Sequence, residues 1–284
     1  MTAQDQARQS TDSEERIALL EADPDLARHV AASELSRARS SVTAPLLVLA
    51  EGRFEPADVF ALGKNPFAAL ILSGLVAREI TVGGQPTLRL LGPGDLIHGG
   101  PIAPGLLTPQ QSYTAAVPTQ VAILDDRFLH AVRHWPRLLT ALVERTADHH
   151  DATLIQLAIS QQPRVEDRLV VLLQALSERW GVVDDRGIVV PLPLTHEALG
   201  RLIGARRPTV TLALKVLDGQ GRLERLPDGA WLLTDVGDGK ASEQLQPLTG
   251  AARPRLLSDP PAPAVASTER PVQWSKLTRE RLKH

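Results

Sequence analysis

Two adjacent arginines, Arg206 and Arg207, follow a glycine closely in the stretch LTHEALGRLIGARRPTVTLALKVL, residues 194–217. A guanidinium group presents five N–H donors in a planar fork, which matches phosphate oxygens and the O6 and N7 acceptors of guanine. Residues 195–225 carry six basic and three acidic side chains, 6 − 3 = +3, whereas the whole chain has a net charge of −2. The local chemistry therefore favours DNA as a partner of this segment.

The spacing around these arginines predicts two short helices. Thr195 is a good N-cap, Ala198, Leu199, Leu202 and Ile203 share one face, and Gly204 ends the first helix. A second helix begins three residues later with Pro208 in its first turn, and its inward side is formed by Val210, Ala213, Leu214 and Leu217. This pattern is typical of a helix-turn-helix, whose second helix enters the major groove of DNA with its amino end first. An ordinary helical hairpin with a solvated arginine pair has the same spacing and stays open as an alternative.

The residues after the helix pair favour a winged helix. GRLERLPDGAWLLT divides into two short runs around Pro227-Asp228-Gly229, which is a hairpin signal. For Arg222 and Arg225 a solvated strand position is the alternative to phosphate contact, and for Leu212 it is packing against the wing. The predicted DNA-binding residues are Thr195, Arg206, Arg207, Pro208, Thr209, Thr211, Leu212, Lys215, Arg222 and Arg225.

Short apolar runs between residues 44 and 124 predict a small antiparallel β domain. Gly, Pro and Asn separate the runs, and Gly83-Gly84 supplies the positive φ angles of a tight hairpin turn. Several strands at this spacing indicate a sandwich or a jelly roll. The runs are APLLVLA, FAALILSG, LVAREITV, TLRLL, YTAAV and QVAIL.

Helical spacing returns from about residue 136 and predicts a helix of some 25 residues, roughly 37 Å long. Its apolar stripe is either a core seam or a dimer seam, and we favour the dimer seam. A further helix follows from about residue 165 and stops at Gly181. The predicted dimerisation residues are Leu138, Leu139, Leu142, His149, Thr153 and Leu157.

The sequence thus predicts an α+β chain with an antiparallel, jelly-roll-like β-roll, a long dimerisation helix and a C-terminal winged helix-turn-helix. The start of the chain looks helical and solvated, with a break at Asp23-Pro24, and the Gln-, Ser-, Pro- and Ala-rich end looks like a flexible tail. The expected parts are a helical lead-in at 1–40, the β-roll at 41–126, a linker and dimerisation helix at 127–162, the DNA-binding domain at 163–236 and the tail at 237–284.

The stretch LTHEALGRLIGARRPTVTLALKVLDGQGRLER resembles the DNA-binding end of the Crp/Fnr family of transcription regulators. The resemblance extends more weakly over residues 40–235, where Gly94-Asp95-Leu96 is similar to a turn of the family's cyclic-nucleotide-binding-like β-roll. It implies a homodimer that binds palindromic double-stranded DNA and contacts RNA polymerase. Pro208 and Leu212 depart from the family's charged recognition residues and imply a different DNA consensus.

The segment that binds the cyclic phosphate in the family departs further. No lysine or arginine stands between Leu90 and Asp126, so a buried phosphate would lack a charge partner within this segment. We therefore expect neither cAMP nor cGMP in the usual mode and no other cofactor. Whether a small-molecule effector exists stays open.

Composition and motifs limit the other classes of function. The chain has no cysteine, which excludes disulfides and thiol chemistry, and it has no signal-peptide core or membrane-spanning run, so we expect a cytoplasmic location without membrane contact. His98 is the one histidine of the β-region, too few for a cupin-like metal site. Neither a nucleophile elbow nor a phosphate-binding glycine loop is present, so an enzyme is not expected. An architectural DNA-binding protein remains the main alternative to a regulator.

Overall fold

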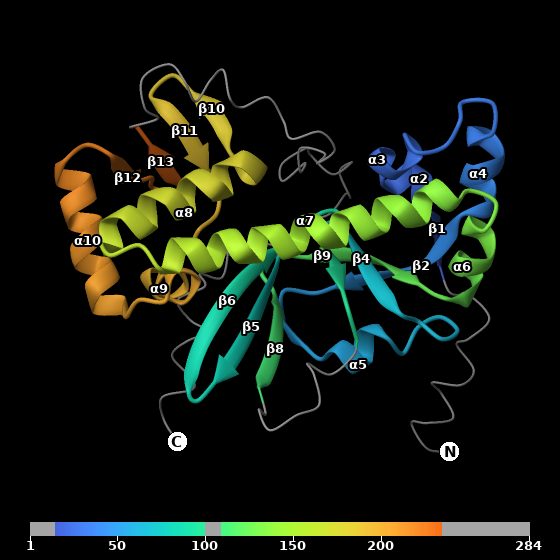
Figure 1. Ribbon diagram of the computed structural model, residues 1–284, viewed down its shortest axis with the longest axis horizontal. Coiled ribbons are helices and arrows are strands. Elements are labelled where there is room, and N and C mark those ends of the chain that lie inside the picture. The colour runs from blue at the N-terminus through green and yellow to red at the C-terminus, as the bar shows by residue number, and fades with distance from the viewer. Residues whose placement is uncertain (1–14, 100–108, 235–284) are drawn as a thin grey trace, which may run out of the picture. The chain divides into compact units, whose positions relative to one another are not determined.

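The computed structural model describes residues 15–99 and 109–234, and these residues form two compact units (Figure 1). The first unit comprises residues up to Gln85 together with Arg89–Asp151, and the second comprises Pro86–Leu88 together with the residues from Ala152 onward. The helix α7 (Pro136–Ser160) belongs to both units, because their boundary falls within it. In the part of the chain described, no helix is both long enough and apolar enough to cross a membrane.

The first unit is built around two antiparallel sheets. One has the strand order β1-β2-β9-β4-β7 and the other β3-β8-β5-β6. Gly83 and Gly84 join β5 to β6 with φ angles of 57° and 76°, which confirms the predicted hairpin. The strands are β1 (Arg16–Ala18), β2 (Thr43–Leu49), β3 (Gly52–Phe54), β4 (Ala68–Ser73), β5 (Val76–Val82), β6 (Gln85–Leu91), β7 (Leu96–Ile97), β8 (Gln110–Ala115) and β9 (Thr119–Leu124).

The two central strands β4 and β9 are covered on both faces because successive side chains point to opposite sides of a sheet. One set of side chains packs between the two sheets, and the alternate set packs against the helices. The predicted α+β fold with an antiparallel β-roll is confirmed. The set between the sheets is Ala69, Ile71, Val121 and Ile123, and the set toward the helices is Ala68, Leu70, Ala122 and Leu124.

In the described part of the lead-in before β2 the main apolar side chains are buried, and for them the prediction of a solvated segment was wrong. It contains α2 (Leu19–Ala22), α3 (Pro24–Ala27) and α4 (Leu35–Ser41), and β1 adds an edge strand to the first sheet. The side chains of Leu19, Leu20 and Leu26 are almost fully buried in the core cluster beneath β4 and β9. The lead-in supplies the apolar layer that the outer face of this sheet requires.

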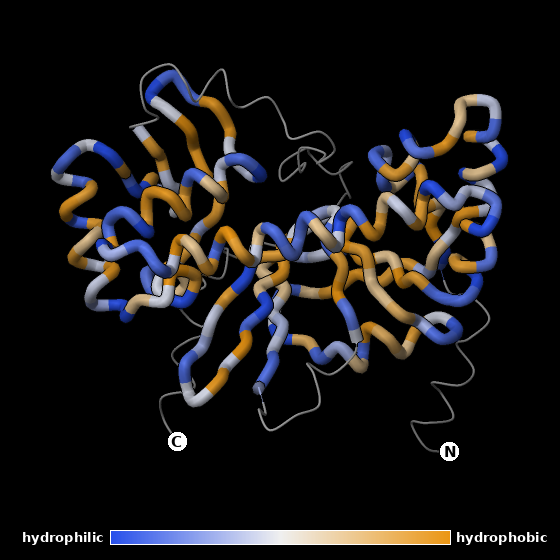
Figure 2. The backbone as a smooth tube through the Cα atoms, viewed as in Figure 1, coloured by the Kyte–Doolittle hydropathy of each residue, from blue (hydrophilic) through white to orange (hydrophobic). Residues whose placement is uncertain are grey.

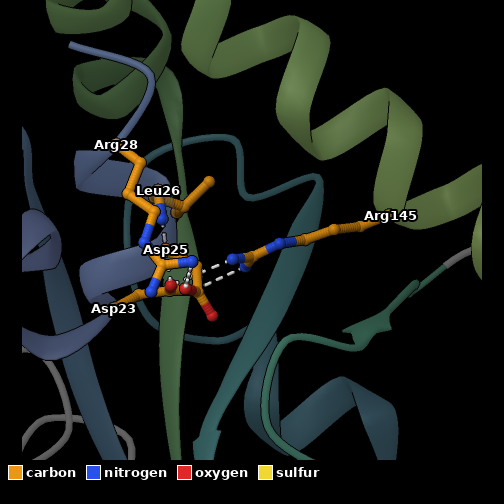
Figure 3. A network of polar contacts seen from close by, with 5 residues as sticks. All are labelled: Asp23, Asp25, Leu26, Arg28 and Arg145. Atoms are coloured by element: carbon orange, nitrogen blue, oxygen red, sulfur yellow. Dashed lines mark hydrogen bonds and ion pairs between the residues drawn. The ribbon is translucent and has the colours of Figure 1, made fainter. Parts of the chain in front are cut away.

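A bidentate ion pair fastens the lead-in to the long helix. The two guanidinium nitrogens of Arg145 on α7 lie 2.5 and 2.9 Å from the carboxylate oxygens of Asp23 (Figure 3). The same carboxylate accepts a hydrogen bond of 3.2 Å from the backbone N–H of Leu26, so Asp23 is also the N-cap of α3. The predicted helix start at Pro24 is confirmed.

The long helix presents two apolar faces, and its hydrophobic and hydrophilic residues alternate along its length (Figure 2). Leu138 and Leu142 are buried in the core of the first unit, and Leu139 packs against that core. For Leu138 and Leu142 the predicted dimer contact was therefore wrong, because a side chain enclosed by its own core cannot reach a partner. Two shorter helices, α5 (Pro56–Val59) and α6 (Asp126–Val132), complete the first unit.

The second unit is a three-helix arrangement with a small sheet. The helices are α8 (Val165–Trp180), α9 (His196–Ile203) and α10 (Arg207–Gly219). The sheet has the order β10-β11-β13-β12, formed by β10 (Val182–Asp184), β11 (Gly187–Val190), β12 (Leu223–Arg225) and β13 (Trp231–Leu233). One face of α8 is buried as predicted, through Leu169, Leu172, Leu173, Leu176 and Trp180. The predicted tail at 237–284 lies outside the described residues.

Candidate nucleic-acid interface

The first helix of the pair, α9, begins and ends where its caps predict. The hydroxyl oxygen of Thr195 accepts a hydrogen bond of 3.1 Å from the backbone N–H of Ala198, which satisfies one of the free donors of the first turn. Gly204 ends the helix in the left-handed conformation, with φ 68° and ψ 36°. Thr195 therefore acts as an N-cap in this structure.

The turn after α9 folds tightly back onto the helix at Gly200. The backbone N–H of Ala205 donates to the carbonyl of Gly200 at 2.8 Å. A Cβ atom at position 200 would stand 2.5 Å from the carbonyl oxygen of Ala205, which is backbone and cannot rotate away. Glycine at this position is thus what allows α10 to start so close to α9.

The second helix, α10, is held by its buried face. Val210, Ala213, Leu214 and Leu217 are buried, as the periodicity predicts. The side chain of Leu212 is 65% exposed, so it does not pack against the wing. Together with the N-cap residue Arg206, the amino end and the outer face of α10 expose most of the predicted DNA-binding residues, namely Arg206, Arg207, Pro208, Thr209, Leu212 and Lys215.

Thr211 differs from the other residues of this face because its hydroxyl is already engaged. It donates to the carbonyl of Arg207 at 3.0 Å, and its oxygen lies 2.9 Å from Nδ1 of His196 at the start of α9. Sequence reasoning missed His196, and no local signal could reveal it, because the contact joins two helices 15 residues apart. Thr211 is placed to hold α10 against α9.

The hairpin predicted as a wing is present. β12 and β13 pair antiparallel, with Arg225 opposite Trp231. The turn is closed by the side chain of Asp228, which accepts a 3.0 Å hydrogen bond from the backbone N–H of Ala230. The guanidinium carbon of Arg225 lies 5.5 Å from the centre of the Trp231 ring, and Arg225 is exposed. Arg222 is half-buried before β12.

The pKa of His196 is affected by nearby positive charges. Burial is the first cause that lowers the pKa of His196, and the positive charges of Arg225 and Arg207 add to it. The amino end of α10 and the wing therefore produce one local positive field, and the positive end of the helix dipole adds to it. Such a field suits the phosphates of DNA.

The remaining predicted dimerisation residues on α7 differ in their exposure. Thr153 and Leu157 are exposed, whereas His149 is half-buried. Nδ1 of His149 lies 3.7 Å from the carboxylate of Asp95, and its carbonyl accepts a 2.9 Å hydrogen bond from Arg89. His149 thus faces the β-roll of its own unit.

At 100° per residue, Val143, Ala147, His150, Leu154 and Leu157 share one side of α7 with spacings of 4, 3, 4 and 3. All five are exposed, and the exposed fractions of Val143, Leu154 and Leu157 are 68%, 51% and 57%. A 4-3-4-3 repeat is the spacing of apolar residues along the seam of a coiled coil. We call these five residues the α7 seam.

In the β-roll, an arginine from another strand lies beside the segment between Leu90 and Asp126. Arg78 on β5 lies 5.8 Å from the ring centre of Tyr113 and donates to the side chain of Gln111 at 2.9 Å. Burial lowers the pKa of His98, followed by the positive charge of Arg78 and then by His149. The lack of basic residues in the segment itself therefore does not leave this region without positive charge.

A family model described as the Crp-like helix-turn-helix domain matches residues 167–237. A curated relative, the global nitrogen regulator of Synechocystis sp. (strain ATCC 27184 / PCC 6803 / Kazusa), is 33% identical over 109 residues. The match covers 32% of this chain and 48% of the relative, so the chain spans about half the length of this relative.

Two solved structures with a TM-score of 0.54 share the fold. A mutant of CooA from Carboxydothermus hydrogenoformans is 20% identical, over 70% of this chain and 87% of its own. A cyclic nucleotide-binding domain containing protein from Listeria monocytogenes EGD-e is 16% identical, over 68% of this chain and 90% of its own. Residues 167–237 are therefore similar to the Crp-like helix-turn-helix domain, and the chain shares the fold of these two solved structures.

Proposed function

We propose that this protein is a transcription regulator of Crp/Fnr type that binds specific DNA sequences. The observation that carries the proposal is the exposed amino end of α10, where Arg206 and Arg207 stand on a helix whose opposite face is buried. In this geometry a guanidinium can reach the O6 and N7 atoms of guanine in the major groove, and exposed Lys215 can reach a phosphate. Pro208 and Leu212 offer apolar contact with thymine methyl groups.

We further propose that the protein binds a palindromic site as a homodimer joined along the α7 seam. The seam supports this because it exposes apolar side chains at coiled-coil spacing, on a side of α7 that the core around Leu138 and Leu142 does not cover. A two-fold dimer presents two copies of α10 to two half-sites, so its operator must be palindromic. Contact with RNA polymerase completes the proposed role.

Repeated selection of random DNA by the purified protein tests these proposals together. The expected product is a palindrome with half-site centres about 10 base pairs apart, or a multiple of this. Enrichment without any sequence pattern would instead support an architectural DNA-binding protein. A single, non-repeated half-site would contradict the dimer and leave sequence-specific binding intact.

We propose that cAMP and cGMP do not control this protein in the usual mode. The absence of basic residues between Leu90 and Asp126 supports this, although Arg78 gives the β-roll a cation from another strand. An enzymatic role finds no support in the residues of the β-roll, and the domain match at residues 167–237 points to DNA binding instead. The test is DNA affinity measured with and without each cyclic nucleotide, which we expect to be unchanged. An increase in affinity that Arg78→Ala abolishes would overturn this proposal.

A further inference from the structure

An open cavity of about 400 Å³ lies in the first unit, where the lead-in meets the start of the long helix. It is formed between α4 and α6, which Figure 1 shows at the same end of α7. Neither the proposed DNA-binding surface nor the polar residues of the β-roll take part in it. Its lining residues are Arg37, Ser41, Arg127, His130, Ala131, His134 and Trp135.

The polar groups of this cavity are mostly donors. No carboxylate lines it among the described residues, and neither Arg37 nor Arg127 forms an ion pair with another described residue. Arg133 donates to Nε2 of His130 at 2.8 Å. Because a guanidinium cannot accept a hydrogen bond, Nε2 is the acceptor and the other ring nitrogen of neutral His130 carries the proton. The cavity therefore combines two guanidinium groups that have no ion-pair partner in residues 15–99 and 109–234 with further N–H and O–H groups.

Trp135 adds a donor beneath the cavity surface. Its side chain is 5% exposed, and its indole N–H has no hydrogen-bond partner in the described chain. Buried polar groups of this kind normally find a partner. Trp180 and Trp231 in the second unit share this property, so the N–H of Trp135 supports a ligand site only in combination with the cavity and its two cations.

We infer that the cavity between α4 and α6 binds an oxyanion, a phosphate or a carboxylate group carried by a small molecule. Two guanidinium groups can share one such anion through charge-assisted hydrogen bonds, and Ser41 can donate a third. The volume lies within the range of small-molecule sites, about 300–1,000 Å³. The inference stands independently of DNA binding, since it uses residues of the other unit only.

Calorimetric titration of the full chain tests this site, with pyrophosphate and citrate as the two probes. We expect at least one probe to bind the wild type, and the double variant Arg37→Ala with Arg127→Ala to weaken that binding about tenfold or more. Comparison of the two probes distinguishes a phosphate site from a carboxylate site. The matched control replaces two exposed arginines elsewhere, Arg53→Ala with Arg186→Ala, and should bind as the wild type does.

A second double variant, Arg206→Ala with Arg207→Ala, separates this cavity from the DNA-binding surface, which also attracts anions. It should retain probe binding, and in nitrogen–proton NMR spectra the indole signal of Trp135 should shift as the probe is added. The inference is overturned if neither probe binds at about 1 mM. Undiminished binding to the Arg37/Arg127 variant, or loss of binding in the Arg206/Arg207 variant, would also overturn it.

Discussion

Nδ1 of His196 lies 2.9 Å from the hydroxyl oxygen of Thr211, and this contact joins the first turn of α9 to the outer face of α10. The Thr211 hydroxyl donates its hydrogen bond to the carbonyl of Arg207. In the contact with His196 the hydroxyl oxygen is therefore the acceptor and Nδ1 is the donor. Nδ1 of His196 therefore carries a proton in this arrangement. A single imidazole thus helps to fix the helix that presents Arg207.

Protonation of His196 should destabilise the fold. Burial, with Arg225 and Arg207, lowers its pKa below the ordinary value of 6.5, so the unfolded chain binds a proton more readily than the folded one. The stability contributed by the neutral ring is complete above about pH 6.5 and is lost as the pH falls toward the folded-state pKa. Urea unfolding near pH 7.5 and pH 5.5 should show a smaller loss for His196→Gln than for the wild type. Equal losses would show that His196 does not titrate in this way.

Gly200→Ala should disturb the turn between the two helices. Its Cβ would meet the carbonyl oxygen of Ala205 at 2.5 Å, and forcing atoms into such a close contact costs about 1–3 kcal/mol. Urea unfolding measures the cost, and DNA affinity should fall with it. Gly219→Ala is the matched control, because nothing lies within 4 Å of its new Cβ and alanine favours a helix. Equal stability of the two variants would contradict the close approach.

Asp23 should stabilise the first unit through both of its roles. Asp23→Asn keeps an N-cap oxygen for Leu26 but removes the charge that binds Arg145, at an expected cost of about 1.5–3 kcal/mol. Asp23→Ala removes the N-cap as well and should lower the free energy of unfolding by about a further 0.5–2 kcal/mol. Arg28→Ala is the control, since this arginine is 72% exposed in its pair with Asp25 and should change stability by less than about 1 kcal/mol. If the lead-in did not pack against the first unit, all three variants would have the same free energy of unfolding in urea.

Leu154→Glu should separate the proposed dimer. A carboxylate in the α7 seam would place like charges opposite each other in a coiled coil and remove apolar contact. Sedimentation should show a monomer and DNA affinity should fall. Thr153 is one of the dimerisation residues predicted from the sequence, but it is not part of the α7 seam. The Thr153→Glu variant should therefore remain dimeric. If Thr153→Glu dissociates the dimer and Leu154→Glu does not, the dimerisation residues predicted from the sequence would be favoured and the α7 seam contradicted.

The sequence predicted the helix pair well because its signals are local. Capping rules identify Thr195 and Gly204 as the ends of α9, and periodicity identifies the inward side of α10. Neither rule needs knowledge of the rest of the chain. The edge strands β1 and β7 were missed, since strands of three and two residues depend on distant partners. The burial of Leu19 and Leu20 was missed for the same reason.

The position of the proposed dimer seam could not be predicted because both buried and exposed apolar residues lie along α7. The buried pair Leu138 and Leu142 and the exposed pair Val143 and Leu157 satisfy helical spacing equally. Only the packed β-roll shows which face is already covered. Similarly, the count of basic residues between Leu90 and Asp126 could not reveal Arg78, which a neighbouring strand brings into the same region.

Base recognition by Arg207 is the central step of the proposed function, and Arg207→Ala compared with Lys215→Ala tests it most directly. Affinity for the selected palindrome and for random DNA should be measured for both variants over a range of salt concentrations. We predict that Arg207→Ala reduces the preference for the selected site by about 1–3 kcal/mol per lost contact, whereas Lys215→Ala weakens binding to both DNAs and flattens the salt dependence. An unchanged preference in the Arg207 variant would contradict base recognition by this residue.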